Sequence, residues 1–184
     1  MIYFTSDLHL CHNREFLFKP RGFSNVEDMN KQIVENWKDI TDEDDVYILG
    51  DLMLNDTEEG MRILRSLKGK LHIIIGNHDT DTRVELYKTL PNLVEEPKYS
   101  TIIKYGKYKF YLCHYPTMTG NLENKHLTEQ LICLYGHTHQ QTNFYNDCPF
   151  IYHVGLDSHN CKPVSIDEVI QDCKAKMIEC INML

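Results

Sequence analysis

The chain has 184 residues, of which 42% are hydrophobic and 25% are charged. These proportions are ordinary for a globular domain and exclude a collagen-like, low-complexity or largely disordered chain. Nineteen Lys and Arg residues stand against 27 Asp and Glu residues, and the resulting net charge of −8 argues against generic binding of duplex DNA or RNA, where basic side chains replace counterions. The length predicts a single domain spanning residues 1–184.

Membrane and secretory signals are not found in the sequence. The start of the chain lacks a basic segment followed by a long apolar run, and no apolar stretch reaches the roughly 20 residues that cross a bilayer. We therefore expect a cytoplasmic protein with no membrane partner. The seven cysteines include no Cys-x-x-Cys pair, which favours reduced thiols over a disulfide framework.

The first half of the sequence alternates predicted strands and helices. Short apolar, β-branched runs predict strands over residues 2–5, 46–49 and 71–75. Ser24 and Glu27 form a capping-box pattern ahead of apolar residues at helical spacing, which predicts a helix over residues 26–40. Two shorter helices are predicted over residues 61–67 and 84–90.

The second half is richer in predicted strands. Two β-rich runs around Gly106 predict a hairpin over residues 101–113, and further strands are predicted over 131–135 and 150–154. A last helix is predicted to open at Ser165 and to run to Leu184. This order of elements predicts an α/β fold in which two packed sheets are flanked by helices.

Nearly every predicted buried strand is followed by residues of the types that bind metal ions. In chain order these residues are Asp7, His9, Asp51, Asn77, His78, Asp79, His114, His137 and His139. Because ligands gather at the carboxyl ends of the strands in open sheets, we expect these side chains to meet in one cleft. Glycines before Asp51, Asn77 and His137 fit sharp turns at that edge.

The chemistry of this set is that of a metal centre. Imidazole nitrogens and carboxylate oxygens suit Mn, Fe, Zn or Ni. Two divalent ions about 3.5–4 Å apart can clamp a phosphoryl group and share an activated hydroxide. Such a pair needs about three or four ligands for each ion and one bridging carboxylate, and the set is large enough to provide them.

The motifs, taken in order, resemble those of the calcineurin-like metallophosphoesterase superfamily. They are Asp7-x-His9, Gly50-Asp51, Gly76-Asn77-His78-Asp79, His114 and Gly136-His137-x-His139. The segments 21–30 and 45–51, together with Trp37, further resemble the small single-domain bacterial and phage members. The resemblance implies a four-layer α/β/β/α sandwich with two mixed sheets flanked by helices.

The resemblance also implies a ligand set for two divalent metal ions, with Mn²⁺ as the first choice and Fe, Zn or Ni as alternatives. One ion would be held by Asp7, His9 and His139. The other would be held by Asn77, His114 and His137, with Asp51 bridging the two.

Catalytic and substrate-binding roles follow from the same resemblance and from sequence position. His78 would donate a proton to the leaving oxygen, and Asp79 would orient or polarise His78. His12, Arg14 and Arg21 follow the first motif and are expected to line the cleft, where an arginine can pair with phosphate oxygens. The alternative for these three is the ordinary polarity of a helix start.

The function implied is a metal-dependent phosphoric ester hydrolase. A metal-bridging hydroxide would attack a phosphomonoester or phosphodiester, and a histidine would act as the general acid. The expected partner is a small phosphate ester, with a nucleotide among the candidates. A nuclease acting on nucleic-acid ends is an alternative, although the acidic balance counts against it. A catalytically silent scaffold is a second alternative, although all the motif positions are filled. The sequence predicts neither the natural substrate nor the oligomeric state.

Overall fold

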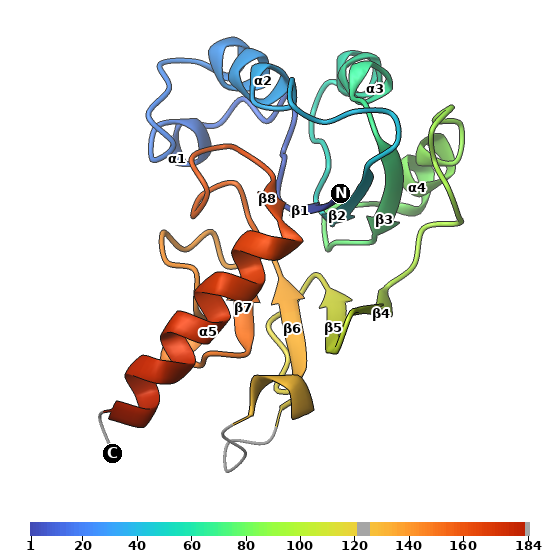
Figure 1. The fold of residues 1–184 in the computed structure, drawn as a ribbon. Coiled ribbons are helices and arrows are strands. Elements are labelled where there is room, and N and C mark those ends of the chain that lie inside the picture. Colours follow the sequence, from blue (N-terminus) through green and yellow to red (C-terminus); the bar gives the residue numbers. More distant parts are fainter. Residues whose placement is uncertain (121–125, 183–184) are drawn as a thin grey trace.

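The computed structural model describes residues 1–120 and 126–182, and its strands form two four-stranded mixed sheets (Figure 1). The last two residues of the predicted C-terminal helix, 183–184, lie outside this range. The first sheet has the order β3-β2-β1-β8. Its parallel strands are β1 (Ile2–Thr5), β2 (Asp45–Leu49) and β3 (Lys70–Ile74), and β8 (Val164–Ser165) runs antiparallel to β1.

The second sheet has the order β4-β5-β6-β7. The predicted hairpin is confirmed as the antiparallel pair β4 (Ser100–Tyr105) and β5 (Tyr108–Cys113). β6 (Leu131–Tyr135) and β7 (Ile151–His153) continue the sheet in parallel with β5. Each sheet therefore has three parallel strands whose carboxyl ends lie at one edge, where loops from separate strands can converge.

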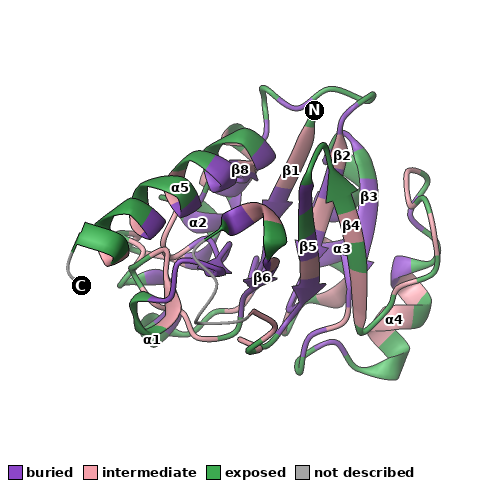
Figure 2. Ribbon diagram, turned by 60° about the horizontal axis from the view of Figure 1, so that its bottom comes forward, coloured by how far each residue is buried: buried purple, intermediate pink, exposed green. Residues whose placement is uncertain are grey.

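The two sheets share one apolar core. Phe4 and Leu49 of the first sheet are buried in the same cluster as Phe110 of the second, and the ring centroids of Phe4 and Phe110 lie 6.3 Å apart. Helix α5 (Ile166–Asn182) adds Val169 and Cys173 to this cluster. Figure 2 shows buried positions along the inner side of α5 and exposed ones along its outer side.

A second apolar core lies between the first sheet and the helices on its other face. Met29 of α2 (Val26–Glu35) and Leu64 of α3 (Thr57–Ser66) are fully buried there against Val46 and Ile48 of β2. The shorter elements are α1 (Glu15–Phe18), α4 (Asp81–Tyr87), η1 (Leu127–Glu129) and η2 (Tyr145–Asp147). Two mixed sheets with flanking helices confirm the predicted sandwich.

The start of α2 differs from the prediction by one residue. Asn25, and not Ser24, is the N-cap, since its side chain accepts a hydrogen bond from the backbone N–H of Asp28 at 2.8 Å. Ser24 lies one position too early for this bond.

The end of α2 also differs, because the helix stops at Glu35 and not near residue 40. The Asn36 side chain donates hydrogen bonds to the backbone carbonyls of Asn160 and Cys161, which fixes the chain in a turn. Trp37 is still buried, with its indole N–H donating to the Lys68 carbonyl at 2.9 Å. The apolar spacing thus marked buried residues correctly beyond the point where the helix ends.

None of the helices in residues 1–120 and 126–182 combines the length and the apolar character that crossing a bilayer requires.

Candidate metal centre

The backbone at the ends of β1 and β2 is held in an uncommon conformation. The N–H groups of Asp7 and His9 donate to the carbonyls of Gly50 and Asp51, both at 3.0 Å. Five of the predicted site residues have φ angles in the left-handed region, between 45° and 69°: Asp7, His9, Asp51, His137 and His139. Residues other than glycine rarely adopt this region, and such positions cluster at functional sites.

Two glycines allow the strand ends to approach each other. A Cβ atom on Gly76 would collide with the Asp51 side chain, and one on Gly136 would collide with Ser6 and Asp7. The motif glycines therefore provide room for the carboxylates, which is a stricter requirement than a sharp turn.

Asp7, His9 and His139 form the first ligand group. The Nε2 atoms of His9 and His139 lie 3.2 Å apart, and each lies within 3.9 Å of Asp7 Oδ1. Burial and the neighbouring His139 ring lower the pKa of His9 to about 2, so this imidazole is neutral and can act as a ligand near neutral pH.

The carboxylate of Asp7 is fully buried. Its Oδ2 accepts hydrogen bonds from the Ser6 hydroxyl at 2.5 Å and from the His137 backbone N–H at 2.9 Å. Burial raises the pKa of Asp7, because a charged carboxylate is poorly solvated there. A nearby cation would offset this cost.

Asn77, His114 and His137, the residues predicted to hold the other ion, lie together and are called the second ligand group below. Asn77 Oδ1 lies 2.9 Å from His114 Nε2 and 2.8 Å from His137 Nδ1. The other ring nitrogen of His114, Nδ1, lies 2.7 Å from the Leu49 carbonyl. A proton on Nδ1 would donate to that carbonyl and leave Nε2 facing the group, as is usual for metal-ligating histidines.

Asp51 lies between the two groups. Its Oδ2 is 3.7 Å from His9 Nε2 and 3.5 Å from His114 Nε2. Burial opposes ionisation of Asp51, but its contacts with His114 and the His78 backbone N–H lower its pKa to about 2. Burial likewise opposes charge on His114, yet the carboxylates of Asp51 and Asp7 raise its pKa to about 9. The negative charges of the two carboxylates therefore favour a positive charge at the centre.

The distances between the candidate ligand atoms, from 2.8 to 3.9 Å, bracket those expected around a bound ion. Atoms that each bind an ion at about 2.1 Å lie roughly 3.0–3.5 Å from one another. Two triads, Asp7/His9/His139 and Asp7/Asp51/His114, are compact. Within each triad the ligand atoms lie within 4.8 Å of one another. Several pairs are too far apart for a hydrogen bond but close enough to share a cation. The donor set of imidazoles and carboxylates therefore fits divalent metal ions.

Asp157 is a site residue that the sequence analysis missed. Its Oδ2 lies 3.0 Å from His139 Nδ1, and both of its oxygens accept hydrogen bonds from Arg21, at 3.0 and 2.7 Å. Hydrogen bonds from His139 and Arg21 hold its pKa well below the usual range in spite of burial. The sequence did carry a sign of this residue. Asp157 follows the buried strand β7 and Gly155, just as the other motif residues follow a strand and a glycine.

Arg21 differs from its predicted role. Its side chain is 1% exposed, and besides Asp157 it donates to the Asp7 carbonyl at 2.8 Å. The guanidinium therefore supports the backbone and the side chain of two ligand positions, and does not present itself to a phosphate group.

His78 and Asp79 lie in different surroundings. His78 is exposed, and its ring centroid is 5.6 Å from that of His9. Asp79 is buried and accepts hydrogen bonds from Tyr87 and from the backbone N–H groups of residues 51, 52 and 76. In the described part of the chain the Asp79 carboxylate accepts hydrogen bonds from these four donors and not from the His78 ring, which differs from the predicted orienting role.

His12 and Arg14 stand beside the first ligand group. The His12 ring is half-buried, with its centroid 5.4 Å from that of His9. Arg14 is exposed at the N-terminal end of α1. Among residues 1–120 and 126–182, neither His12 nor Arg14 forms a buried ion pair, in contrast to Arg21.

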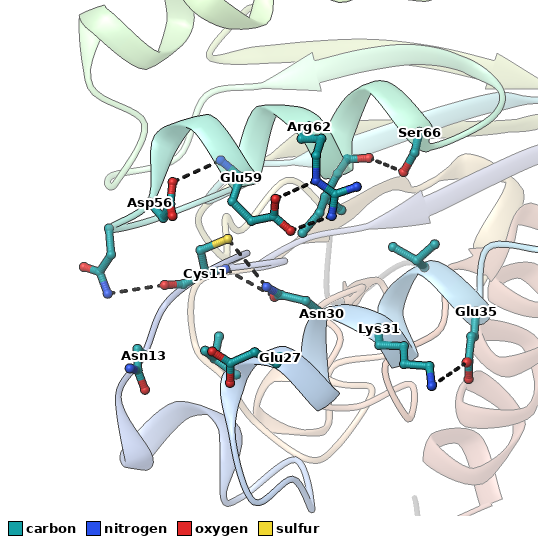
Figure 3. Close-up of a pocket in the computed structure, with 14 residues that line it drawn as sticks. Cys11, Asn13, Glu27, Asn30, Lys31, Glu35, Asp56, Glu59, Arg62 and Ser66 are labelled. Atoms are coloured by element: carbon teal, nitrogen blue, oxygen red, sulfur yellow. Dashed lines mark hydrogen bonds and ion pairs between the residues drawn. The ribbon is translucent and has the colours of Figure 1, made fainter.

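A separate groove lies between α2 and α3 (Figure 3). Ion pairs line its walls, Arg62 with Glu59 and Lys31 with Glu35, and the Asn30 side chain accepts a hydrogen bond from the Cys11 N–H at 3.2 Å. Among the residues that line it, none belongs to the two ligand groups. This groove is therefore distinct from the candidate metal centre.

Known proteins share the sequence pattern and the fold of this chain. Residues 1–155 match the calcineurin-like phosphoesterase superfamily domain. The whole chain is 33% identical to the uncharacterized protein MJ1445 of Methanocaldococcus jannaschii, of which it covers 97%. The Gene 66 protein of Mycobacterium phage L5 is 34% identical over 82 residues, which are 42% of this chain and 39% of that protein. The solved structure of AQ665 from Aquifex aeolicus, a protein of unknown function, has a TM-score of 0.67 at 24% identity, covering 93% of this chain and 98% of that one. The fold is thus shared with AQ665.

Proposed function

Because the chain belongs to the calcineurin-like phosphoesterase superfamily, we propose that it hydrolyses a phosphomonoester or phosphodiester with the help of two divalent metal ions. The observation that carries the proposal is the position of Asp51, whose Oδ2 lies within 3.7 Å of both His9 Nε2 and His114 Nε2. One carboxylate thus faces two separate ligand groups.

The ligand groups divide the ions as follows. Asp7, His9 and His139 would hold one ion, Asn77, His114 and His137 would hold the other, and Asp51 would contact both. Mn²⁺ is the first choice, and Fe, Zn and Ni also suit these donors. When bound, two such ions supply Lewis-acid polarisation of phosphoryl oxygens and an activated water nucleophile.

The protein's own residues would complete the chemistry. The His78 N–H donates to Asp51 Oδ1 at 2.8 Å, which fixes the His78 backbone beside the ligand groups while its ring stays exposed. This ring would hold a proton and pass it to the oxygen of the leaving group. A poor alkoxide leaving group needs such a proton more than a phenolate does.

A small ester suits the molecule better than a nucleic-acid duplex. The net charge of −8 would repel a long polyanion, which makes the nuclease alternative less favourable. A metal-free scaffold would leave the buried Asp7 carboxylate without a divalent cation, so that imidazole rings and hydrogen bonds would have to offset the cost of its burial. Both observations favour a hydrolase for small substrates.

The test combines metal analysis with turnover. The purified chain, stripped with a chelator and reloaded with Mn²⁺, is expected to bind two ions and to hydrolyse bis(4-nitrophenyl) phosphate or 4-nitrophenyl phosphate. Asp51→Asn is expected to weaken both ions together, whereas Asp45→Asn, on β2 and paired with His72, is expected to leave binding unchanged. Two ions at full affinity in Asp51→Asn would refute the bridge. Two bound ions without turnover of either ester would favour the scaffold.

A further inference from the structure

Two exposed aromatic side chains flank the candidate metal centre. On this basis we propose that the site takes a small phosphodiester with two planar aromatic substituents, one packed on Tyr115 and the other on Phe16. This inference rests on the proposed phosphoesterase function and specifies its substrate class.

Tyr115 borders the second ligand group. It directly follows His114, and its ring centroid lies 5.1 Å from that of His114 and 4.8 Å from that of His137, edge-on in both cases. Its side chain is nevertheless 48% exposed. The Tyr115 carbonyl accepts hydrogen bonds from the Cys113 thiol and the Thr117 hydroxyl, so the backbone that carries the ring is fixed. Tyr115 thus offers a positioned, open aromatic surface next to two ligands.

Phe16 borders the first ligand group, with one imidazole between. Its ring centroid lies 5.6 Å from that of His12, which in turn lies 5.4 Å from that of His9. The Phe16 side chain is 73% exposed, although it is one of the most apolar types. Its ring therefore offers an apolar face on which a planar ligand group can pack.

The contacts run from one aromatic ring to the other through the centre. Phe16 contacts His12, which contacts His9, and Asp51 joins His9 to His114, which contacts Tyr115. A phosphoryl group at Asp51 would therefore have one aromatic surface along the contacts through His114 and another along the contacts through His9 and His12. A monoester has a single carbon substituent and would use one surface, whereas a diester has two substituents and would use both.

Exposed aromatic side chains such as Tyr115 and Phe16 bind planar groups. Nucleobases and aryl rings stack on exposed aromatic side chains without a requirement for particular hydrogen bonds. The net charge of −8 disfavours a long polyanion, so a diester of dinucleotide size or smaller fits best.

Two diesters with the same leaving group test the proposal. Bis(4-nitrophenyl) phosphate carries two rings, and methyl 4-nitrophenyl phosphate carries one. For the first ester, Tyr115→Ala and Phe16→Ala are each expected to raise KM on the order of tenfold. For the second ester only one of the two variants is expected to raise KM, because a single ring occupies a single surface. Tyr115→Phe is expected to behave like the wild type.

Controls separate stacking from damage to the site. Tyr105→Ala removes an aromatic ring at the other end of the β4–β5 hairpin and is expected to leave both KM values unchanged. Metal content measured on Tyr115→Ala is expected to equal that of the wild type. Equal effects of both variants on both esters, or no effect on either, would overturn the proposal. Failure of the wild type to hydrolyse either diester would instead overturn the phosphodiesterase function itself.

Discussion

Asp157 Oδ2 lies 3.0 Å from His139 Nδ1, so the carboxylate decides which ring nitrogen of His139 faces the metal position. Arg21 in turn holds Asp157 with two hydrogen bonds, and both side chains are almost fully buried, at 1% and 4% exposure. A buried ion pair of this geometry is costly to break from one side. The three residues therefore act as a fixed support for one ligand.

Asp157→Asn is expected to weaken the ion held by His139 by about 10- to 100-fold, because the substituted amide no longer fixes the tautomer as the carboxylate does. Equilibrium dialysis with Mn²⁺ measures this affinity. Glu59→Gln, which breaks the exposed pair with Arg62, serves as the control and is expected to have no effect. Unchanged affinity for both ions in Asp157→Asn would show that His139 needs no such support.

His78→Ala is expected to retain both metal ions and to lose about 10²- to 10⁴-fold in turnover, since it removes the proton donor and no ligand. The loss is expected to be largest for esters with alkyl leaving groups. Steady-state kinetics with paired alkyl and aryl esters, together with metal analysis, measure both quantities. If alkyl esters turned over at the wild-type rate, another group would have to supply the proton.

Asp79→Ala is expected to lower the free energy of unfolding by about 3–5 kcal/mol, because three backbone N–H groups and the Tyr87 hydroxyl lose their acceptor. Tyr87→Phe removes only one of these hydrogen bonds and is expected to cost about 1.5–3 kcal/mol. Urea unfolding of metal-free protein measures both. A stable Asp79→Ala protein with reduced turnover would instead support the orienting role for His78.

His153 is expected to make the folded protein less stable in acid. Its ring is fully buried, and burial lowers its pKa to about 3, against 6.5 in the unfolded chain. Between pH 6.5 and about 3, His153 is therefore protonated in the unfolded chain but neutral in the folded protein. This difference does not lower the free energy of unfolding above pH 6.5. As the pH falls from 6.5 toward 3, it lowers the free energy of unfolding by at most about 1.4 kcal/mol per pH unit.

Urea unfolding of the wild type and His153→Gln at pH 7.5 and 5.5 measures this contribution. The wild type is expected to lose more stability between the two pH values than the variant does, because glutamine has no such proton to bind. Parallel losses would assign the acid sensitivity to other groups.

The sequence predicted the strands and the candidate ligands for the same reason. Each ligand motif directly follows a short apolar run, as at Asp51 after β2 and His114 after β5, so one pattern marked both the element and the side chain at its end. The sheet order, in which β8 lies beside β1, had no comparable signal.

The elements and roles that the sequence did not predict share a physical reason. α1 has four residues and β8 has two, so neither is long enough to show a periodic pattern. Arg21 and Asp157 are 136 positions apart, and their pairing depends on tertiary contacts alone. The sequence shows that Arg21 is cationic, but it does not show that the guanidinium is buried and paired with Asp157.

The arrangement of the first sheet has a consequence for synthesis on the ribosome. β1 is made first, but its neighbour β8 begins only at Val164, after Asp157. A nascent chain that has passed residue 139 already carries all the motif histidines, yet it lacks the edge strand that pairs with Tyr3 and Phe4 of β1. We therefore expect translation products that stop before Val164 to expose an unpaired edge of β1, which favours aggregation.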